Sequence, residues 1–233
     1  ADGLNIANNI RMTGTNDPVI DTGSFSETLS GTISGGGLLT KQGSGTLTLA
    51  GANNYTGATD VAAGTLRAGA AGTFSAASVH NVAAGATLDL AGFSQTVAGV
   101  SNAGTVSLVG SAPGTTLTVN GAWVGNNGTL RMGTALGDST SVSDRLVLSG
   151  AGASASGTTN VQITNLGGLG GLTSGSGIEV ISATNGATTT AQTTKSAFVL
   201  AGGHVDAGAH EYRLGTAGAA GARVARKPCE IEC

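Results

Sequence analysis

Short segments of alternating apolar and polar residues recur along the first half of the chain. Four of them, residues 45–51, 64–69, 85–92 and 104–110, open with glycine and continue as apolar-x-apolar. Alternation with a period of two predicts short strands that each bury one face. The glycine and asparagine residues around them supply the positive φ angles that tight corners demand. The pattern therefore predicts an all-β protein.

The segments repeat at a nearly constant interval, as the positions of their opening glycines show: Gly45, Gly64, Gly85 and Gly104. A short strand cannot bury its apolar face alone, whereas stacked copies give each strand a hydrogen-bonded neighbour and one shared core. We therefore predict a parallel β-helix (a β-solenoid) with roughly 20 residues per coil. The pattern of leucine-rich repeats does not recur, and the glycine content disfavours helical repeats.

The strand positions that we expect to face the core are aliphatic. They are Leu47, Leu49, Val61, Leu66, Leu88, Leu90, Val97, Val106 and Leu108. Only 3% of the residues are aromatic, which agrees with a narrow core of stacked aliphatic side chains. We interpret these residues as core rather than as the lining of a binding groove.

Composition narrows the possible classes of protein. The chain has 233 residues, 41 of them glycine, and only 10% are charged, with a formal net charge of −3. Glycine shows no three-residue period, which excludes collagen, and the acidic balance provides no basic face for nucleic acid. The longest apolar runs are far shorter than the roughly 20 residues of a membrane-spanning helix.

Motifs of the common catalytic and metal-binding classes do not occur in the sequence. It contains no G-x-S-x-G, H-E-x-x-H, P-loop, G-x-G-x-x-G or calcium-binding glycine repeat. The segment 167–171 resembles a phosphate loop only in its glycine content, so we expect a flexible turn there. We expect no enzyme activity, cofactor, metal site or small-molecule substrate.

Isolated imidazole and carboxylate groups remain to be considered. The histidines are His80, His204 and His210. A pair of carboxylates for glycoside cleavage would have to come from Asp60, Asp89 and Asp138. Chance pairs of this kind are expected on a solenoid with many polar corners, so we assign none of them a catalytic role.

The end of the chain differs in composition from the rest. Residues 223–233 hold three of the ten Lys and Arg residues and both cysteines, Cys229 and Cys233. We expect residues 216–233 to be a tail outside the fold, left over from expression. The alternative is a metal or disulfide pair, for which a lone C-x3-C is weak evidence. Because no basic and apolar leader follows Ala1, we expect a fragment of a longer chain.

One stretch of the first half matches a known repeat densely. The matching residues are Gly43, Gly45, Leu47, Leu49, Gly51, Asn53, Tyr55, Gly57, Thr59, Gly64 and Leu66. This stretch resembles the autotransporter-associated β-strand repeat, whose pattern is Gly-x-Gly-x-Leu-x-Leu-x-Gly-x-Asn-x-Tyr-x-Gly-x-Thr followed by Gly-x-Leu.

The second half carries a further resemblance. Its segments are residues 117–123, 128–130, 137–138, 143–148, 165–170, 175–181, 198–200 and 207–214. In this order they are similar to the autochaperone segment that ends the passenger of pertactin-like autotransporters. The chain departs from that pattern at His210, where the family usually has an aromatic residue, and at Val142, where proline is common in the family. The two resemblances cover roughly residues 30–215.

The resemblance implies a passenger fragment of a Gram-negative type V secretion protein, displayed at the cell surface or released. The passenger would be a right-handed β-helix, with residues 1–111 as its stem and residues 112–215 as an autochaperone cap. The cap would template folding of the passenger during secretion, and the partner would be the protein's own C-terminal β-barrel translocator. The alternative is an adhesin that contacts host cells or matrix, with residues 182–196 as the candidate loop.

Trp123, Phe198 and Tyr212 are the large anchors that we expect in the cap, whereas we expect the stem to rely on Leu and Val; burying aromatic rings would stabilise a small unit. We expect its folding core to comprise Trp123, Leu130, Asp144, Arg145, Leu146, Ile178, Phe198, Leu200, Tyr212 and Leu214. For the adjacent Asp144 and Arg145 two interpretations remain open: an ion pair or cap, or two solvated residues where a strand begins.

Overall fold

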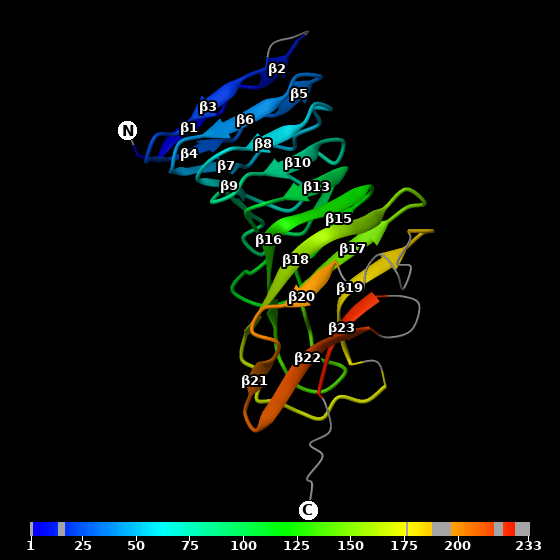
Figure 1. Cartoon of the computed structure of the whole chain (residues 1–233). Coiled ribbons are helices and arrows are strands. Elements are labelled where there is room, and N and C mark those ends of the chain that lie inside the picture. The colour runs from blue at the N-terminus through cyan, green and yellow to red at the C-terminus, as the bar shows by residue number, and fades with distance from the viewer. Residues whose placement is uncertain (1, 14–16, 176, 188–196, 217–220, 227–233) are drawn as a thin grey trace, which may run out of the picture.

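The computed structural model describes residues 2–13, 17–175, 177–187, 197–216 and 221–226. The elements of these described residues are 23 strands, β1 to β23, and no helix occurs among them. The predicted all-β class is confirmed. The strands are stacked along one axis, from the N-terminal coils at the top of Figure 1 to the C-terminal hairpin at the bottom.

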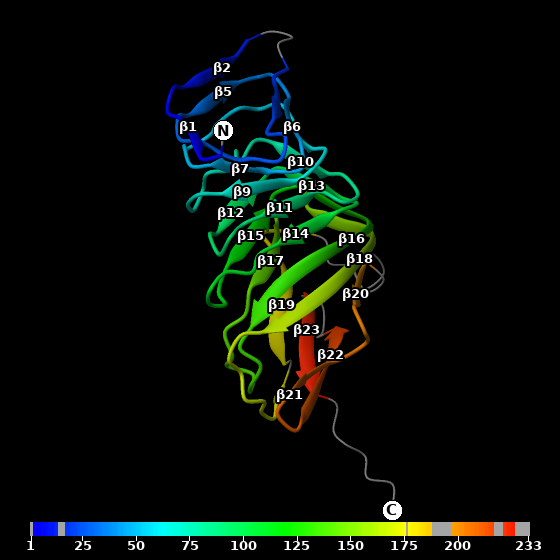
Figure 2. The ribbon, with the colours of Figure 1, turned by 90° about the vertical axis from the view of Figure 1, so that its left-hand side faces the viewer.

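Parallel strands form three faces around this axis (Figures 1 and 2). Face 1 contains β1 (Leu4–Ile6), β4 (Ser26–Leu29), β7 (Thr46–Leu49), β9 (Thr65–Ala68), β11 (Thr87–Asp89) and β14 (Thr105–Ser107). Face 2 contains β3 (Val19–Asp21), β6 (Leu39–Gln42), β8 (Thr59–Val61), β10 (Val79–Val82) and β13 (Gly99–Asn102). Face 3 contains β2 (Ile10–Met12), β5 (Ile33–Gly35), β12 (Gln95–Val97), β15 (Thr116–Val119), β17 (Arg145–Ser149) and β19 (Ile178–Thr184).

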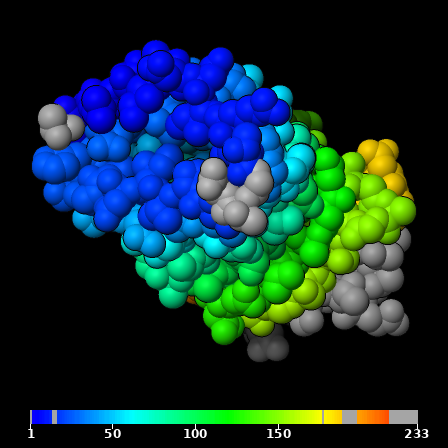
Figure 3. Space-filling view, turned by 90° about the horizontal axis from the view of Figure 1, so that it is seen from above, coloured from blue at the N-terminus to red at the C-terminus, as the bar shows by residue number. Residues whose placement is uncertain are grey.

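The register of face 1 gives the length of each coil. Thr46 pairs with Thr65, Thr65 pairs with Thr87, and Thr87 pairs in turn with Thr105. Each of these steps advances the chain by roughly 20 residues, the length expected of one repeat. The stem is therefore a right-handed β-helix with the predicted coil length. Figure 3 looks onto its N-terminal coils from above.

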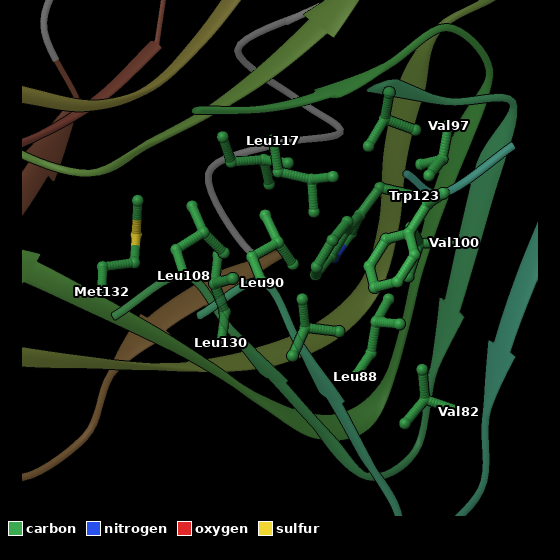
Figure 4. Close-up of a cluster of buried hydrophobic side chains, with 14 of the residues drawn as sticks. Val82, Leu88, Leu90, Val97, Val100, Leu108, Leu117, Trp123, Leu130 and Met132 are labelled. Atoms are coloured by element: carbon green, nitrogen blue, oxygen red, sulfur yellow. The ribbon is translucent and has the colours of Figure 1, made fainter. Parts of the chain in front are cut away.

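The interior of the stem is a stack of aliphatic side chains. Leu47, Leu66, Leu88 and Val106 lie in register on successive strands of face 1 and are fully buried. All nine positions predicted to face the core are buried. Figure 4 shows several of these side chains pointing from different strands into one interior. The stack confirms that these residues form the core.

Two long strands carry the helix from the stem into the cap. β16 (Ala122–Thr134) pairs with β13 of face 2 through its first part and with β14 of face 1 through its second part. It bends between the two where Asn127 adopts a φ of 61°, a left-handed conformation that asparagine tolerates. β18 (Ser154–Asn165) follows β16 along its whole length, with a register shift after Asn126. One strand thus contributes to two faces.

The coils of the cap are longer than those of the stem. Thr129 pairs with Asn160, and Leu146 pairs with Ile181, so each of these register steps is larger than the steps of face 1 in the stem. The additional residues form the connections between β16 and β17 and between β18 and β19. These connections are the segments that the buried polar side chains of the cap hold in place.

An antiparallel layer ends the helix. β20 (Phe198–Leu200) is parallel to β18, whereas β21 (Val205–Ala207), β22 (His210–Thr216) and β23 (Gly221–Arg226) form an antiparallel sheet. β23 also pairs antiparallel with β19 and so covers the edge of the last parallel strand of face 3. For Thr216 and residues 221–226 this pairing corrects the expectation of a tail outside the fold; the rest of the predicted tail, residues 217–220 and 227–233, lies outside the described residues. Cys229 and Cys233 lie outside the described residues.

Candidate functional site

Trp123 connects the faces of the cap. Its side chain is fully buried on β16, and its indole N–H donates a hydrogen bond to Thr159 Oγ1 at 2.9 Å. The ring of Phe198, on β20, lies 6.2 Å from the Trp123 ring, centroid to centroid. Val100 of the stem pairs with Trp123 in the register of β13 and β16. The predicted anchor therefore contacts both the stem and the last coil of the cap.

The aliphatic members of the predicted folding core continue the columns of the stem. Leu130 pairs with Val106 of the stem and with Val161 of the cap, and Val161 pairs with Leu200. On face 3, Leu146 pairs with Leu117 and Ile181. Ile178 is buried, and Leu214 is partly buried and packs against the core.

Asp144 makes three side-chain hydrogen bonds in the cap. Its side chain is fully buried. Oδ1 accepts hydrogen bonds from the backbone N–H groups of Gly114 and Thr115, both at 2.9 Å, and Oδ2 accepts one from Gly133 at 2.6 Å. The carboxylate thus joins the segment before β15 to the end of β16.

Burial raises the pKa of the Asp144 carboxyl above its ordinary value, although the three N–H donors favour the charged form. A carboxylate is suited to this place because it offers only acceptors to three converging N–H groups. Removal of the side chain would leave three buried donors without partners, which is costly. The role of Asp144 is therefore to hold two connections of the cap together.

Arg145 and Asp144 do not form the ion pair that was one of the two open interpretations. Arg145 Nη2 instead forms an ion pair with Glu179 Oε1, between the neighbouring strands β17 and β19. The Arg145 side chain is 46% exposed, so water screens this pair. The second interpretation, two solvated residues, describes Arg145 in part and is wrong for Asp144.

Tyr212 joins the terminal hairpin to two connections of the cap. Its side chain is fully buried on β22. Its hydroxyl accepts a hydrogen bond from Gly171 N–H at 2.7 Å and lies 2.8 Å from Gly137 O and 2.9 Å from Gly171 O, both acceptors. These contacts span 75 and 41 residues of sequence. Tyr212 therefore holds the hairpin against the rest of the cap.

The glycine-rich segment 167–171 is packed, which corrects the expectation of a flexible turn. Asn165 holds Gly168 through both backbone groups, and Gly170 N–H donates to Leu136 O at 2.9 Å. A Cβ atom on Gly168 would overlap the backbone of Leu136. Glycine is needed here for close approach of two backbones, and not for a phosphate.

The stem contains a buried polar network that sequence reasoning did not assign. Asn53 Oδ1 accepts a hydrogen bond from Ile33 N–H, and Asn53 Nδ2 donates to Thr73 O, both at 2.7 Å. The amide therefore joins the coils above and below it. Gln95, two coils further on, accepts from Phe74 N–H at 3.0 Å and donates to Ala70 O at 2.7 Å, so its amide joins its own coil to the preceding one. The two amides replace strand pairing on face 3.

Tyr55 extends this network between faces 3 and 2. Its hydroxyl lies 2.6 Å from Thr59 Oγ1, which lies 2.8 Å from Ser78 Oγ. Burial raises the pKa of Tyr55 to about 12, so the phenol stays protonated. Ser75 Oγ donates to Tyr55 O at 2.5 Å. The Asn, Tyr and Thr positions of the repeat are thus explained by buried hydrogen bonds, and their spacing was the signal that could have revealed them.

His80 is an inward-facing imidazole in the core of the stem. It lies in register between Thr59 and Val100, and its ring centroid is 5.4 Å from that of Phe74. Nδ1 lies 3.2 Å from Ser78 O, whereas Nε2 has no hydrogen-bond partner among the described residues. Burial lowers the pKa of His80 to about 4, so the ring is neutral near pH 7.

The remaining acidic candidates stand apart from one another. Asp60 accepts a hydrogen bond from Asn81 on face 2, Asp89 lies 3.7 Å from Arg67 on face 1, and Asp138 accepts hydrogen bonds from Thr140 in the cap. Among the described residues, no group of three or more His, Cys, Asp and Glu side chains is arranged to hold a metal ion. The part of the chain described by the structure also contains no helix that is long and apolar enough to cross a membrane.

Two family models match the chain. The model of the Autochaperone Domain Type 1 matches residues 94–214, and that of the passenger-associated-transport repeat matches residues 39–68. This chain belongs to the autotransporter passengers. Autotransporter passengers are exposed at the surface of Gram-negative cells or secreted across the outer membrane, and family membership implies a linked C-terminal translocator.

Two similar proteins are much longer than this chain. It is 40% identical over 185 residues to the uncharacterized protein YuaQ of Escherichia coli (strain K12), covering 78% of this chain and 12% of YuaQ. It is 37% identical over 206 residues to the adhesin BmaC autotransporter of Brucella suis biovar 1, covering 84% of this chain and 5% of BmaC. The chain therefore spans a small part of these relatives.

The two matched regions contain residues of the two sets of buried polar side chains described above, one in the stem and one in the cap. The repeat match, residues 39–68, runs from β6 to β9 and includes Asn53, Tyr55 and Thr59. The autochaperone match, residues 94–214, runs from the start of β12 into β22 and includes all ten residues of the predicted folding core.

Proposed function

We propose that the cap, residues 112–215, folds first and templates the folding of the stem, residues 1–111, during secretion of the passenger. The proposal is supported by the strand pairing at their boundary. β16 pairs with β13 through Trp123 and its neighbours and with β14 through Leu130 and its neighbours. β15 pairs with β12 of the stem. Two strands of the cap thus offer a strand edge to each of the three faces.

A template is needed because of how repeat proteins fold. Each coil contacts only its neighbours, so the first coil to form has no partner on which to stack. An ordered strand edge recruits further strands readily. No ATP is available outside the cell, and a folded coil cannot slide back through a narrow pore. A domain stability of about 5–15 kcal/mol, gained coil by coil, is sufficient to bias export.

The cap contains its own stabilising contacts. Asp144 bonds to Gly114, Thr115 and Gly133, and Tyr212 bonds to Gly137 and Gly171, all within residues 112–215. The buried amides of the stem instead join one coil to the next. A unit whose connections are joined by hydrogen bonds within the unit itself is suited to fold before its neighbours. The strand β23 lies beyond residue 215, where the cap was predicted to end, and we include this strand in the folded cap.

Pulse-labelling hydrogen exchange during refolding of the 233-residue chain tests the proposed order. We expect amides of β16, β17 and β18 to become protected before those of β7 and β9. Simultaneous protection of both groups, or earlier protection of the stem strands, would contradict the templating role.

A matched pair of variants sharpens this test. Asp144→Asn removes a buried acceptor of the cap, and Asp138→Asn changes an exposed carboxylate of the same region. We expect Asp144→Asn to delay protection of both cap and stem, whereas Asp138→Asn leaves the order and the rates unchanged. Delay of the cap alone would show that the stem does not depend on it.

A second candidate function is adhesion. It is favoured by the similarity to BmaC, which is named an adhesin. Residues 188–196 of the predicted contact loop lie outside the described residues, so the structure adds no support for this loop. Binding of the purified chain to host cells or to extracellular matrix, lost on replacement of residues 182–196, would favour adhesion. We propose no catalytic role for this part of the passenger.

A further inference from the structure

One corner of the β-helix joins the stem to the cap through a buried amide. Asn102 is the last residue of β13, where the final coil of the stem turns from face 2 to face 1, and its side chain is fully buried. In Figure 2 the strands β13 and β14 of this coil lie against β16, with which both of them pair. Asn102 therefore lies beside the bend at which β16 makes the same turn.

Three hydrogen bonds connect Asn102, Gly104 and Thr129 in a closed ring. Gly104 N–H donates to Asn102 Oδ1 at 3.1 Å, and Asn102 Nδ2 donates to Thr129 O at 3.0 Å. Thr129 N–H donates to Gly104 O at 2.7 Å and closes the ring. A Cβ atom on Gly128 would lie 2.6 Å from Asn102 Cγ, so only glycine leaves space for the amide here.

The ring determines where pairing on face 1 begins. Gly104 is the last residue before β14, and Thr129 is the first residue of β16 that pairs with β14. Because the amide bonds to both, it holds them against each other. Thr105 is then placed directly opposite Thr129.

The apolar pattern does not by itself select this register. A shift of one residue would turn the inward side chains of β14 outward, whereas a shift of two residues keeps inward positions inward. Val106 pairs with Leu130 in the structure, and Leu108 would take its place after a shift of two residues. Both Val106 and Leu108 are aliphatic and fully buried. The choice between the two registers therefore depends on another contact.

The stem contains a second buried polar residue at the same corner of the helix. The corner positions of face 2 lie in one column: Lys41, Val61, Val82 and Asn102. The Lys41 ammonium donates to Gly43 O of its own corner at 2.8 Å and to Ala63 O of the next coil at 3.1 Å. Lys41 and Asn102 thus both bond to their own corner and to the coil that follows in sequence, which the valines between them cannot do.

We propose that Asn102 is the positioning residue that sets the register in which the last coil of the stem docks on the cap. A buried asparagine fixes register because a shifted partner leaves its amide without hydrogen bonds, as in coiled coils. A shift of two residues would move Gly104 away from Thr129 and break the ring. The coils stacked on β14 would inherit the register that the cap passes to this strand. This inference rests on the proposed templating for the direction of the transfer.

Disulfide formation reads this register. In a background with Cys229→Ser and Cys233→Ser, Thr105→Cys with Thr129→Cys joins residues that are paired in the observed register. Ser107→Cys with Thr129→Cys joins residues that would be paired after the shift. Directly paired residues lie close enough for a disulfide, whereas residues two positions out of register do not. The refolded 233-residue chain is oxidised briefly, and mass spectrometry measures the yield of each disulfide.

Replacement of the amide should move the yield from the first pair to the second. Asn102→Val gives this corner the side chain of Val61 and Val82, its neighbours in the column, and removes the ring. We expect the yield of the shifted pair to rise at least about tenfold, because two buried hydrogen bonds are lost.

A matched control removes an exposed amide from the same pair of strands. Asn126 Nδ2 on β16 donates to Ser101 Oγ on β13 at 2.9 Å, at an exposed position. Asn126→Val should therefore leave both disulfide yields unchanged. Asn102→Leu, which is closer to asparagine in shape, is measured in parallel and should behave as Asn102→Val does.

Four results would overturn the proposal. Equal yields with and without the Asn102 amide would show that the amide does not choose the register. Loss of the first disulfide without a gain in the second would show that Asn102 only attaches the stem to the cap. An equal shift in Asn126→Val would show that the buried position is not decisive. Failure of both Asn102 variants to protect β17 and β18 from hydrogen exchange would show that the amide is needed for folding itself.

This test is separate from the test of templating. The disulfides report the register of molecules that are already folded, whereas pulse labelling reports which region becomes protected first. A register that does not depend on Asn102 would leave the order of folding untouched, and simultaneous folding of stem and cap would leave the disulfide yields interpretable.

Discussion

The stem and the cap use the same strand register but satisfy their buried polar groups differently. In the stem, the side chain of Asn53 joins the coils on either side of it, and the interior is mainly aliphatic. In the cap, Asp144 and Tyr212 join connections that are up to 75 residues apart in sequence, and the two regions both bury aromatic rings, Tyr55 and Phe74 in the stem and Trp123 and Phe198 in the cap. The comparison indicates that the stem depends on its neighbours, whereas the cap depends on its own long-range contacts.

Truncation of the central aromatic residue should give the largest difference between the two regions. Trp123→Ala leaves a large cavity and an unpaired Thr159 hydroxyl, at a cost of about 3–5 kcal/mol. Leu66→Ala also creates a cavity, but in a coil of the stem, which on the proposed order of folding forms after the template. We expect Trp123→Ala to reduce refolding yield and surface display more than Leu66→Ala does, measured side by side. The reverse order would contradict the template role of the cap.

Acid should weaken the stem through His80. The pKa of His80 is about 4 in the folded protein, against an ordinary value of about 6.5 in the unfolded chain. The unfolded state therefore binds more protons between these values, and stability falls as the pH is lowered from about 6.5 to about 4. The total loss is roughly 3 kcal/mol, at about 1.36 kcal/mol for each unit of pKa difference.

A variant without the imidazole isolates this effect. His80→Val places a β-branched side chain between Thr59 and Val100 and removes the titrating group. Urea unfolding of both proteins from pH 7 to pH 4 should show a smaller loss of stability for His80→Val. Identical pH profiles would show that His80 is not buried as a neutral ring.

Replacement of the Asp144 carboxylate should have an intermediate effect. In Asp144→Asn the amide nitrogen faces at least one of the three backbone N–H donors, which leaves a buried donor unsatisfied. We expect a loss of about 1–3 kcal/mol in the free energy of unfolding. Chemical denaturation beside the exposed Asp138→Asn control measures it, and equal stability of the two variants would refute this role.

The smallest effect is expected at the partly exposed ion pair of the cap. Arg145→Gln breaks the contact with Glu179, and screened pairs of this kind contribute about 0–1 kcal/mol. The variant should therefore refold almost as well as the parent chain. A loss as large as that of Asp144→Asn would show that Arg145 has a structural role beyond this pair.

Much of the fold could be predicted from the sequence because the repeat determines both the length of each coil and the parallel direction of the stacked strands. The alternation at Leu47, Leu49 and Leu66 predicted which side chains are buried, and the glycine spacing predicted the coil length. Lys41 illustrates what alternation does not reveal. It faces inward, and its ammonium donates to the carbonyls of Gln42, Gly43 and Ala63. Only the three-dimensional path of the corner brings these acceptors together.

The sequence indicated which side chains belong to the candidate site, but it did not indicate which residues they contact. Trp123 and Tyr212 stood out as rare large side chains. The partners of Asp144 lie about 11 to 30 positions away in sequence, and no local pattern encodes them. The strand at Gly221–Arg226 was missed because its composition differs from the rest, while its pairing with β19 depends on backbone hydrogen bonds that many sequences can form.

Native-state hydrogen exchange of the 233-residue chain in increasing urea tests the central difference between the regions most directly. We predict that amides of β7, β9 and β11 exchange through a partial opening of lower free energy, while those of β16, β17 and β18 exchange only on global unfolding. A single opening free energy shared by all of these strands would contradict the account.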